Sequence, residues 1–276
     1  MRAHDLGRFP PEELARRVAA EGLDGVQLAL GKAIEGLEMA PGVLDPGMAS
    51  SIGAAFARNR VRIEVLGCYI NPIHPDPEAR RSLLGLFKEH LRHARGFGCN
   101  LVALESGSLN ADYSPHPGNG GESAFQELLG SMDELVAEAE LCGVVVGIEA
   151  VTSHVVSTPE KMRRLLDAIP SPHLQVVYDA VNLLSLGNCL EHRDIMRRSF
   201  DQFGDRIAVA HLKDFRIADG RLAVCPAGTG LLDFGLLLSG LAAGRPGIPL
   251  LLEETGPEHV AGCAGFIRNK QLSPIS

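Results

Sequence analysis

Residues 143–184 contain the stretch that decides the fold: GVVVGIEAV (143–151), then STPEKMRRLLDAI (157–169), then LQVVYDAVNLL (174–184). The two outer segments are short apolar runs, and each ends abruptly in a carboxylate, Glu149 in the first and Asp179 in the second. Between them, Thr158 is suited to be a helix N-cap and Pro159 the first helical residue. Apolar runs without alternation are typical of strands covered on both faces, as in a parallel sheet. The stretch therefore predicts a βαβ unit.

The position of these two carboxylates indicates a ligand site. In parallel α/β sheets, groups at the carboxyl ends of the strands face the bound ligand. Glu149 and Asp179 stand at equivalent strand ends, which favours a shared metal or acid–base site. The alternative is that each is an ordinary carboxylate in a surface loop. For either residue considered alone, the two interpretations are equally good.

The rest of the chain repeats the same alternation of strand and helix. Strands are expected near 2–5, 23–30, 61–68, 100–104, 144–148, 174–178, 206–210 and 248–252. Helices are expected near 10–21, 46–59, 77–94, 122–141, 158–169, 191–203, 234–243 and 258–268, with long loops over 105–121 and 213–230. Eight strands alternating with eight helices, without a linker, predict an α/β fold: a (β/α)8 TIM barrel forming one domain over residues 1–276.

Composition is that of an ordinary globular protein, with 45% hydrophobic and 22% charged residues in 276. The formal charge of −8 gives no sign of a nucleic-acid-binding surface. The six cysteines include no C-x-x-C pair, which predicts mostly buried thiols in a reducing compartment. The first residues lack the apolar core of a signal peptide, and no apolar run reaches membrane-spanning length. A cytoplasmic location without membrane association is therefore expected.

Four predicted strand ends carry a coherent set of ligands. The last four strands end in Glu149, Asp179, His211 and either Glu253 or Glu254, because the apolar run before the two last acids has no polar face to choose between them. Three oxygens and one imidazole suit a divalent ion such as Mn²⁺, Mg²⁺ or Co²⁺, and Zn²⁺ is possible. The alternative is four unrelated polar strand ends.

The chain also resembles a known family. The segments GVVVGIEAV, VVYDAVNLL, AVAHLKDF, PAGTGLLDF and PLLLEET are similar to those of xylose isomerase-like barrels, which include sugar-phosphate isomerases and epimerases, ketose 3-epimerases and relatives of endonuclease IV (AP endonuclease family 2). The ketose-epimerase branch implies one metal ion, with Mn²⁺ expected, held by the residues Glu149, Asp179, His211 and Glu253. It implies that Glu149 and Glu253 also act as the acid and base. Homo-oligomers are common in the family.

Such a site suits proton transfer next to a carbonyl. A divalent ion on two adjacent sugar oxygens stabilises the enediolate that forms when a C–H proton leaves. Return of a proton from the other side gives epimerisation, and return to the neighbouring carbon gives aldose–ketose isomerisation. The expected activity is therefore that of a metal-dependent sugar isomerase or epimerase with a small carbohydrate substrate.

Five further residues are candidates for substrate contact. They are His74, Glu105, His154, Asn182 and Lys213. The alternative for His74, which stands between two prolines, is that it braces its own loop. The alternative for Glu105 is that it caps the loop that follows it. His154 and Lys213 have the alternative of solvated loop residues. Asn182 stands where the ketose epimerases often have a substrate-binding histidine. The second acid that this branch carries beyond Glu149 is not evident, and His154 and Val155 lie near its position. Both departures speak against ordinary 3-epimerisation of a free ketohexose and leave room for a modified or oxidised sugar.

Two other functions remain open from the sequence. A phosphoesterase of the endonuclease IV type uses two or three metals with several additional His and acidic ligands. Strand-end histidines are few here and the charge is acidic, so a nucleic-acid substrate is not expected. A barrel that binds metal or sugar without turnover is the third possibility.

Overall fold

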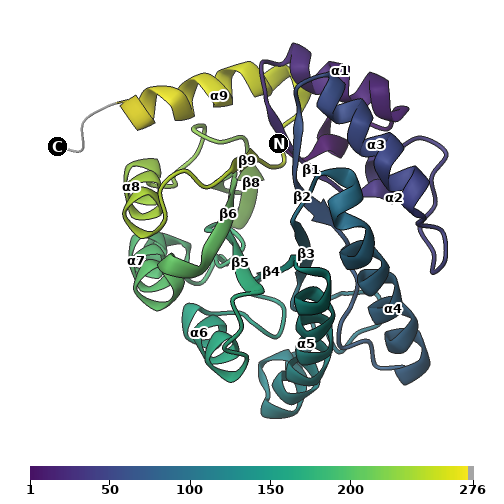
Figure 1. The fold of residues 1–276 in the computed structure, drawn as a ribbon. Coiled ribbons are helices and arrows are strands. Elements are labelled where there is room, and N and C mark those ends of the chain that lie inside the picture. Colours follow the sequence, from purple (N-terminus) through teal and green to yellow (C-terminus); the bar gives the residue numbers. More distant parts are fainter. Residues whose placement is uncertain (273–276) are drawn as a thin grey trace.

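The computed structural model describes residues 1–272, which form a parallel sheet curled into a barrel with helices around it (Figure 1). The hydrogen-bonded order of the seven strands is β1-β2-β3-β4-β5-β6-β9. They are β1 (Gly25–Leu28), β2 (Arg62–Gly67), β3 (Leu101–Glu105), β4 (Val145–Glu149), β5 (Leu174–Asp179), β6 (Ile207–Leu212) and β9 (Leu250–Leu252). Strands β1 to β6 pair in the order of the sequence, β6 pairs with β9, and helices lie in the connections. The prediction of a (β/α)8-type barrel is confirmed.

The strand predicted at 2–5 is wrong beyond its first residue. Arg2 N–H donates to Leu252 O at 2.9 Å and Gln27 N–H donates to Met1 O at 2.9 Å, so residues 1–2 lie between β9 and β1. The chain then turns into a 3-10 helix, Ala3–Leu6. The Asp5 carboxylate accepts from the Arg2 guanidinium at 2.7 Å, which closes that turn. The eighth position of the barrel is therefore only a two-residue segment.

Helix starts follow ordinary capping rules. The helices are α1 (Pro11–Ala20), α2 (Leu30–Ala33), α3 (Pro46–Arg58), α4 (Pro77–His93), α5 (Glu122–Cys142), α6 (Pro159–Ala168), α7 (His192–Phe203), α8 (Phe234–Gly244) and α9 (Pro257–Leu272). Further 3-10 turns are Ala94–Phe97, Pro117–Gly120, Cys189–Glu191 and Gly204–Arg206. Thr158 accepts from Lys161 N–H, with Pro159 in the first turn, as predicted. Asp45, Asp76 and Asp233 cap α3, α4 and α8 in the same way.

The loop predicted over 213–230 contains an antiparallel hairpin. Its strands are β7 (Asp214–Ala218) and β8 (Arg221–Cys225). Asp219 and Gly220 form the turn with φ of +51° and +68°. Positive φ at both central residues is what a two-residue hairpin turn requires, and Asp-Gly provides it at low cost.

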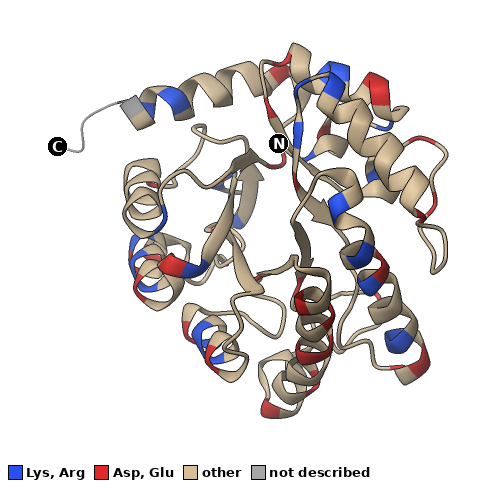
Figure 2. Cartoon of the chain, in the orientation of Figure 1, with Lys and Arg blue, Asp and Glu red and all other residues tan. Residues whose placement is uncertain are grey.

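The barrel interior is filled from the bottom by a small apolar cluster. It consists of Val65, Leu101, Ala103, Val177, Val209 and Leu251. Gly147 also faces inward, because a Cβ there would lie 2.9 Å from the side chains of Leu101 and Val177. Since strand side chains alternate with a period of two, the residues two positions further along these strands point into the mouth of the barrel. Charged residues are spread over the surrounding helices (Figure 2).

The structure also bears on the cysteines and on the expected lack of membrane-spanning segments. All six cysteines are free, and five of them are buried. Among the described residues 1–272, no helix has both the length and the apolar character needed to cross a membrane.

Candidate metal and active site

Glu149, Asp179, His211 and Glu253 come together at the carboxyl ends of β4, β5, β6 and β9. Each offers one ligand atom, and these four atoms lie within 4.8 Å of one another. All four side chains are buried. The structure thus brings the predicted ligands into one group, which we call the acid–histidine group.

Strand alternation explains why Glu253 and not Glu254 enters this group. Leu251 points into the inner apolar cluster, so the residue two positions later points into the mouth. Glu254 instead has a φ of +50°, and its side chain is 52% exposed. It forms an ion pair with Arg2 at 3.0 Å outside the group.

His211 is the centre of the group. Its Nδ1 lies 3.3 Å from Glu149 Oε1 and 3.4 Å from Glu253 Oε2. Its Nε2 lies 2.6 Å from Gln27 Oε1 on the opposite side. Burial alone would lower the pKa of His211, but the Glu149 and Glu253 carboxylates outweigh it and raise the pKa to about 9. In the metal-free protein at neutral pH, the imidazole therefore carries a second proton.

A buried lysine completes the charge balance. Lys213 Nζ lies 3.0 Å from Asp179 Oδ2 and 3.1 Å from Glu253 Oε2. It also donates to Asn182 Oδ1 at 2.8 Å. Burial raises the pKa of Asp179 to about 7, with Lys213 acting against that rise and Glu253 adding to it. Burial also opposes ionisation of Glu253, but His211 and Lys213 hold the pKa of this carboxyl well below its usual range.

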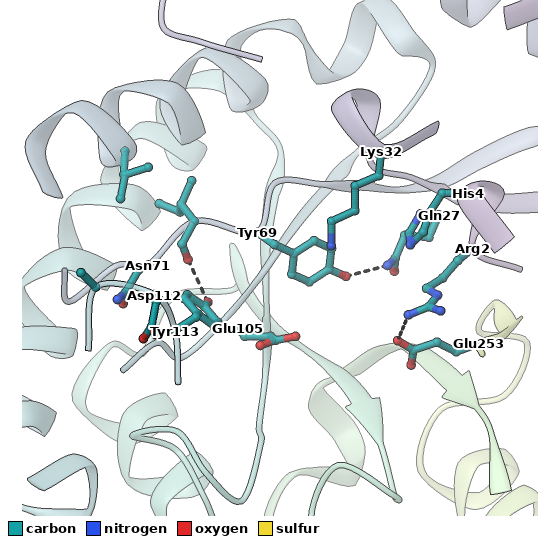
Figure 3. A pocket seen from close by; sticks show the side chains of 13 residues that line it. Arg2, His4, Gln27, Lys32, Tyr69, Asn71, Glu105, Asp112, Tyr113 and Glu253 are labelled. Carbon is teal, nitrogen blue, oxygen red and sulfur yellow. Dashed lines mark hydrogen bonds and ion pairs between the residues drawn. The ribbon is translucent and has the colours of Figure 1, made fainter. Parts of the chain in front are cut away.

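A cavity of about 460 Å³ opens beside Glu253 of the acid–histidine group, and Figure 3 shows the side chains that line it. Glu253 belongs to both. The polar residues of the cavity wall are Arg2, His4, Gln27, Lys32, Tyr69, Asn71, Glu105, Asp112, Tyr113 and Glu253. Its size and polar lining suit a small hydroxylated molecule.

Glu105 stands on the cavity wall with His154 next to it. Glu105 Oε2 lies 3.3 Å from His154 Nδ1, and the ring of Tyr113 packs edge-on against His154 at 4.8 Å. Burial, together with the charges of Glu149 and Glu253, raises the pKa of Glu105 to about 8. Burial lowers the pKa of His154 to about 4. In the metal-free protein at neutral pH, both side chains are therefore mainly uncharged.

The other candidates for substrate contact lie in different places. Asn182 Nδ2 donates to Glu149 Oε1 at 2.7 Å, so Asn182 and Lys213 contact the acid–histidine group directly. His74 does not line the cavity. Its Nδ1 accepts from Asp76 N–H at 3.2 Å at the start of α4, which is the bracing alternative raised for it.

Arg2, Gln27 and Lys32 are among the residues of the site that the sequence did not indicate as candidates. Arg2 Nη1 donates to Glu253 Oε1 at 2.9 Å. Lys32 Nζ lies 5.3 Å from the centroid of the Tyr69 ring. The only sequence signal was a glutamine inside the otherwise apolar run GVQLAL, since a polar residue in a buried strand needs partners.

The donor set fits a divalent cation. Three carboxylates and one imidazole are hard and borderline ligands, respectively. They face one another in a buried space, where three carboxylates without a cation would repel strongly. Lys213 and protonated His211 supply positive charge in the metal-free protein. The group can therefore take a metal once the proton on His211 Nδ1 is displaced.

Metal affinity is expected to rise with pH. His211 carries an extra proton below pH about 9, and Asp179 carries one below pH about 7. Each proton that the ion displaces raises the apparent affinity by about tenfold per pH unit. Mn²⁺ titrations from about pH 6 to about pH 10 should show a steeper slope below 7 and a plateau above 9. An affinity independent of pH would contradict this reading.

The stability of the metal-free protein should follow the opposite trend through His211. A pKa raised from 6.5 to about 9 gives stabilisation that is complete below pH 6.5 and lost as pH rises through about 9. Thermal unfolding of the chelated protein over that window checks the sign.

Comparison with known proteins agrees with this geometry. The family model described as xylose isomerase-like TIM barrel matches residues 15–269. No curated protein sequence matches significantly. Similar solved structures include a xylose isomerase-like TIM barrel protein from Mycobacterium smegmatis in complex with magnesium (13% identity, TM-score 0.73, 100% of both chains). Others are the apo form of 3-keto-D-glucoside 4-epimerase from E. coli (17%, 0.67, 95% of both) and D-psicose 3-epimerase from Clostridium cellulolyticum H10 with D-tagatose (14%, 0.70, 96% of both). The chain therefore belongs to the xylose isomerase-like TIM barrel family.

Proposed function

We propose that this protein is a divalent-metal-dependent isomerase or epimerase of a sugar or a sugar derivative such as a keto-sugar. The observation that carries the proposal is the acid–histidine group beside a cavity of about 460 Å³, with Glu253 shared by both. Structural neighbours that are named as epimerases of a 3-keto-glucoside and of psicose support the reaction class.

In this proposal the four residues of the acid–histidine group hold the cation, and Mn²⁺ is the ion we favour. The ion supplies positive charge where an oxygen becomes negative as a neighbouring C–H proton leaves. Lys213 Nζ adds a second positive charge within 3.1 Å of Glu253 Oε2. The buried position of the group keeps bulk water from screening these charges.

Glu149 and Glu253 are the proposed acid and base. Asn182 holds Glu149 Oε1, which leaves Oε2 to take a proton, since no described residue donates to it. Arg2 holds Glu253 Oε1, so that Oε2 faces His211 and Lys213. The two carboxylates come from β4 and β9, with β5 and β6 between them. They can therefore approach one carbon from different sides, as proton removal and return in an epimerisation require.

Glu105 and His154 are proposed to recognise the rest of the substrate. Glu105 lies on the cavity wall, where its carboxyl group can hydrogen-bond a sugar hydroxyl. His154 Nδ1 lies 3.3 Å from Glu105 Oε2, and Tyr113 packs against the His154 ring. This pairing takes the place of the second acid expected on the loop after β4.

The proposal is tested by combining metal replacement with proton exchange. The purified protein is stripped with a chelator, reloaded separately with Mn²⁺, Mg²⁺, Co²⁺ or Zn²⁺, and incubated in D₂O with free ketohexoses, keto-sugars and sugar phosphates. Metal-dependent incorporation of deuterium at a carbon next to the carbonyl supports the proposal. Metal binding without exchange on any sugar would indicate a binding protein, and activity that survives complete chelation would remove the mechanism.

His211→Ala should weaken metal binding strongly. Removing a residue that only hydrogen-bonds to a metal ligand typically lowers metal affinity by about 10–100-fold, and removing the ligand itself should lower it further. The imidazole supplies the one nitrogen donor of the acid–histidine group. The measurement is Mn²⁺ titration by calorimetry. His259→Ala is the matched control, because that side chain is 52% exposed on α9 and its ring pairs with Glu258 rather than with the acid–histidine group. Equal affinity in both variants would contradict the assignment.

A further inference from the structure

Gln27 is a buried polar residue whose two polar ends are both occupied. It lies on β1 and is 1% exposed. Its Oε1 lies 2.6 Å from His211 Nε2, and its Nε2 donates to Tyr69 OH at 2.6 Å. An apolar side chain would fill this strand position without the cost of desolvating an amide. The two short contacts therefore indicate a role for the amide beyond packing.

The contact with His211 fixes which nitrogen of that ring is available to a ligand. Nδ1 faces Glu149 and Glu253, whereas Nε2 faces Gln27. A neutral imidazole binds a cation through the nitrogen that lacks a proton, so the proton must sit on Nε2 and needs an acceptor there. Gln27 Oε1 is that acceptor. It accepts from Nε2–H equally well when Nδ1 carries a proton, so the ring keeps one orientation in both states.

The contact with Tyr69 leaves a hydrogen-bond donor in the cavity. The Tyr69 oxygen accepts from Gln27 Nε2, so the phenolic proton is directed elsewhere. No residue in the described part of the chain accepts it, and Tyr69 lines the cavity together with Glu105 and Glu253 (Figure 3). Burial, with the nearby carboxylates of Glu149 and Glu253, raises the pKa of Tyr69 well above 10, so the proton stays in place.

We propose that the Gln27 amide is a positioning group with two outputs: it presents His211 Nδ1 to the metal, and it aims the Tyr69 hydroxyl at an oxygen acceptor of the bound sugar. The inference rests on the proposed function and deepens it. It assigns Tyr69 to recognition of a carbonyl or hydroxyl oxygen at the end of the cavity nearest β1. Metal site and substrate recognition are then linked through one side chain.

Three substitutions separate the two outputs. Gln27→Met keeps the volume but neither accepts nor donates, so Mn²⁺ affinity should fall by about 10–100-fold. Gln27→Glu keeps an oxygen that accepts from His211 Nε2–H. Its second carboxylate oxygen would accept the Tyr69 O–H, which is then no longer available to the sugar. It should therefore bind Mn²⁺ at least as tightly as the wild type while losing kcat/KM on the sugar. Tyr69→Phe should lower kcat/KM by about tenfold, the size of one hydrogen bond, with unchanged Mn²⁺ affinity.

A spectroscopic readout distinguishes positioning from general damage. In the metal-free protein, at a pH where the ¹⁵N shifts show His211 to be neutral, the spectra should show a single tautomer with the proton on Nε2, which donates to Gln27 Oε1. Gln27→Met should shift the resonances toward a mixture of tautomers, and Gln27→Glu should restore the wild-type pattern. Melting curves of the metal-free variants verify that each is folded.

The outcomes are decisive in both directions. Wild-type Mn²⁺ affinity and an unchanged tautomer in Gln27→Met would overturn the positioning role. A loss of Mn²⁺ affinity of about tenfold or more in Gln27→Glu would also overturn it, and this outcome can be read even if Gln27→Met fails to fold. Wild-type kcat/KM in Tyr69→Phe would overturn the recognition role. If His211→Ala itself binds Mn²⁺ normally, the proposed function fails; if only the Gln27 variants behave normally, the inference fails alone.

Discussion

Glu149→Gln is expected to lower kcat by about 10²–10⁴-fold, the usual contribution of a general acid or base. The glutamine side chain has the same shape but cannot take a proton. The carboxylate is almost fully buried and Asn182 Nδ2 donates to it at 2.7 Å, a bond that an amide oxygen can still accept. The fold should therefore survive, while metal affinity also falls because an amide oxygen carries no charge.

The measurement is kcat on an active sugar together with deuterium incorporation and a melting curve. Glu134→Gln is the matched control, because this glutamate lies on α5, with its side chain 48% exposed in an ion pair with Lys88. It should keep wild-type activity. Proton exchange at the wild-type rate in Glu149→Gln would show that another group moves the proton.

The acid–histidine group could be predicted from sequence because of how parallel strands are built. Each of these strands is an apolar run that stops at a polar residue, and the barrel brings all such ends to one rim. Glu149, Asp179 and His211 were therefore visible without coordinates. The choice of Glu253 over Glu254 could not be made from the apolar run alone. It requires the observation that Leu251 points into the barrel, because the residue two positions later then points the same way. The resemblance to the family had pointed to the same residue.

Other features depended on contacts that no local pattern encodes. The first strand shrinks to residues 1–2 because an ion pair between Arg2 and Asp5 turns the chain, and ion-pair partners cannot be read from composition. Gln27 reaches His211 across 184 positions of sequence. The hairpin within 213–230, in contrast, has a local sequence pattern. The dipeptide Asp219-Gly220 is typical of a two-residue hairpin turn, although the segment was interpreted as a long loop.

Glu253→Gln and Glu254→Gln should behave very differently although the residues are adjacent. Glu253 is 8% exposed and contacts three cationic side chains, those of Arg2, His211 and Lys213. Removing its charge takes one buried partner from each of these cations, and breaking a buried pair typically costs about 3–5 kcal/mol. Asp5, Glu149 and Asp179 stay beside Arg2, His211 and Lys213, respectively, which limits the cost. Relief of repulsion with Asp179 and Glu149 offsets part of this. We expect the metal-free protein to lose about 3 kcal/mol of unfolding free energy, the lower end of that range.

Glu254→Gln removes only a pair with Arg2 at the rim, in which the carboxylate is 52% exposed. Exposed pairs of this kind are worth about 0–1 kcal/mol, so stability should change little. Turnover should fall sharply in Glu253→Gln and stay near wild type in Glu254→Gln, because only the first carboxylate reaches the acid–histidine group. Urea unfolding of the chelated proteins and kcat of the metal-loaded ones measure both effects. If Glu254→Gln were the more damaging variant, Glu254 would be the fourth ligand, and the assignment of which residues after β9 point into the barrel would be wrong.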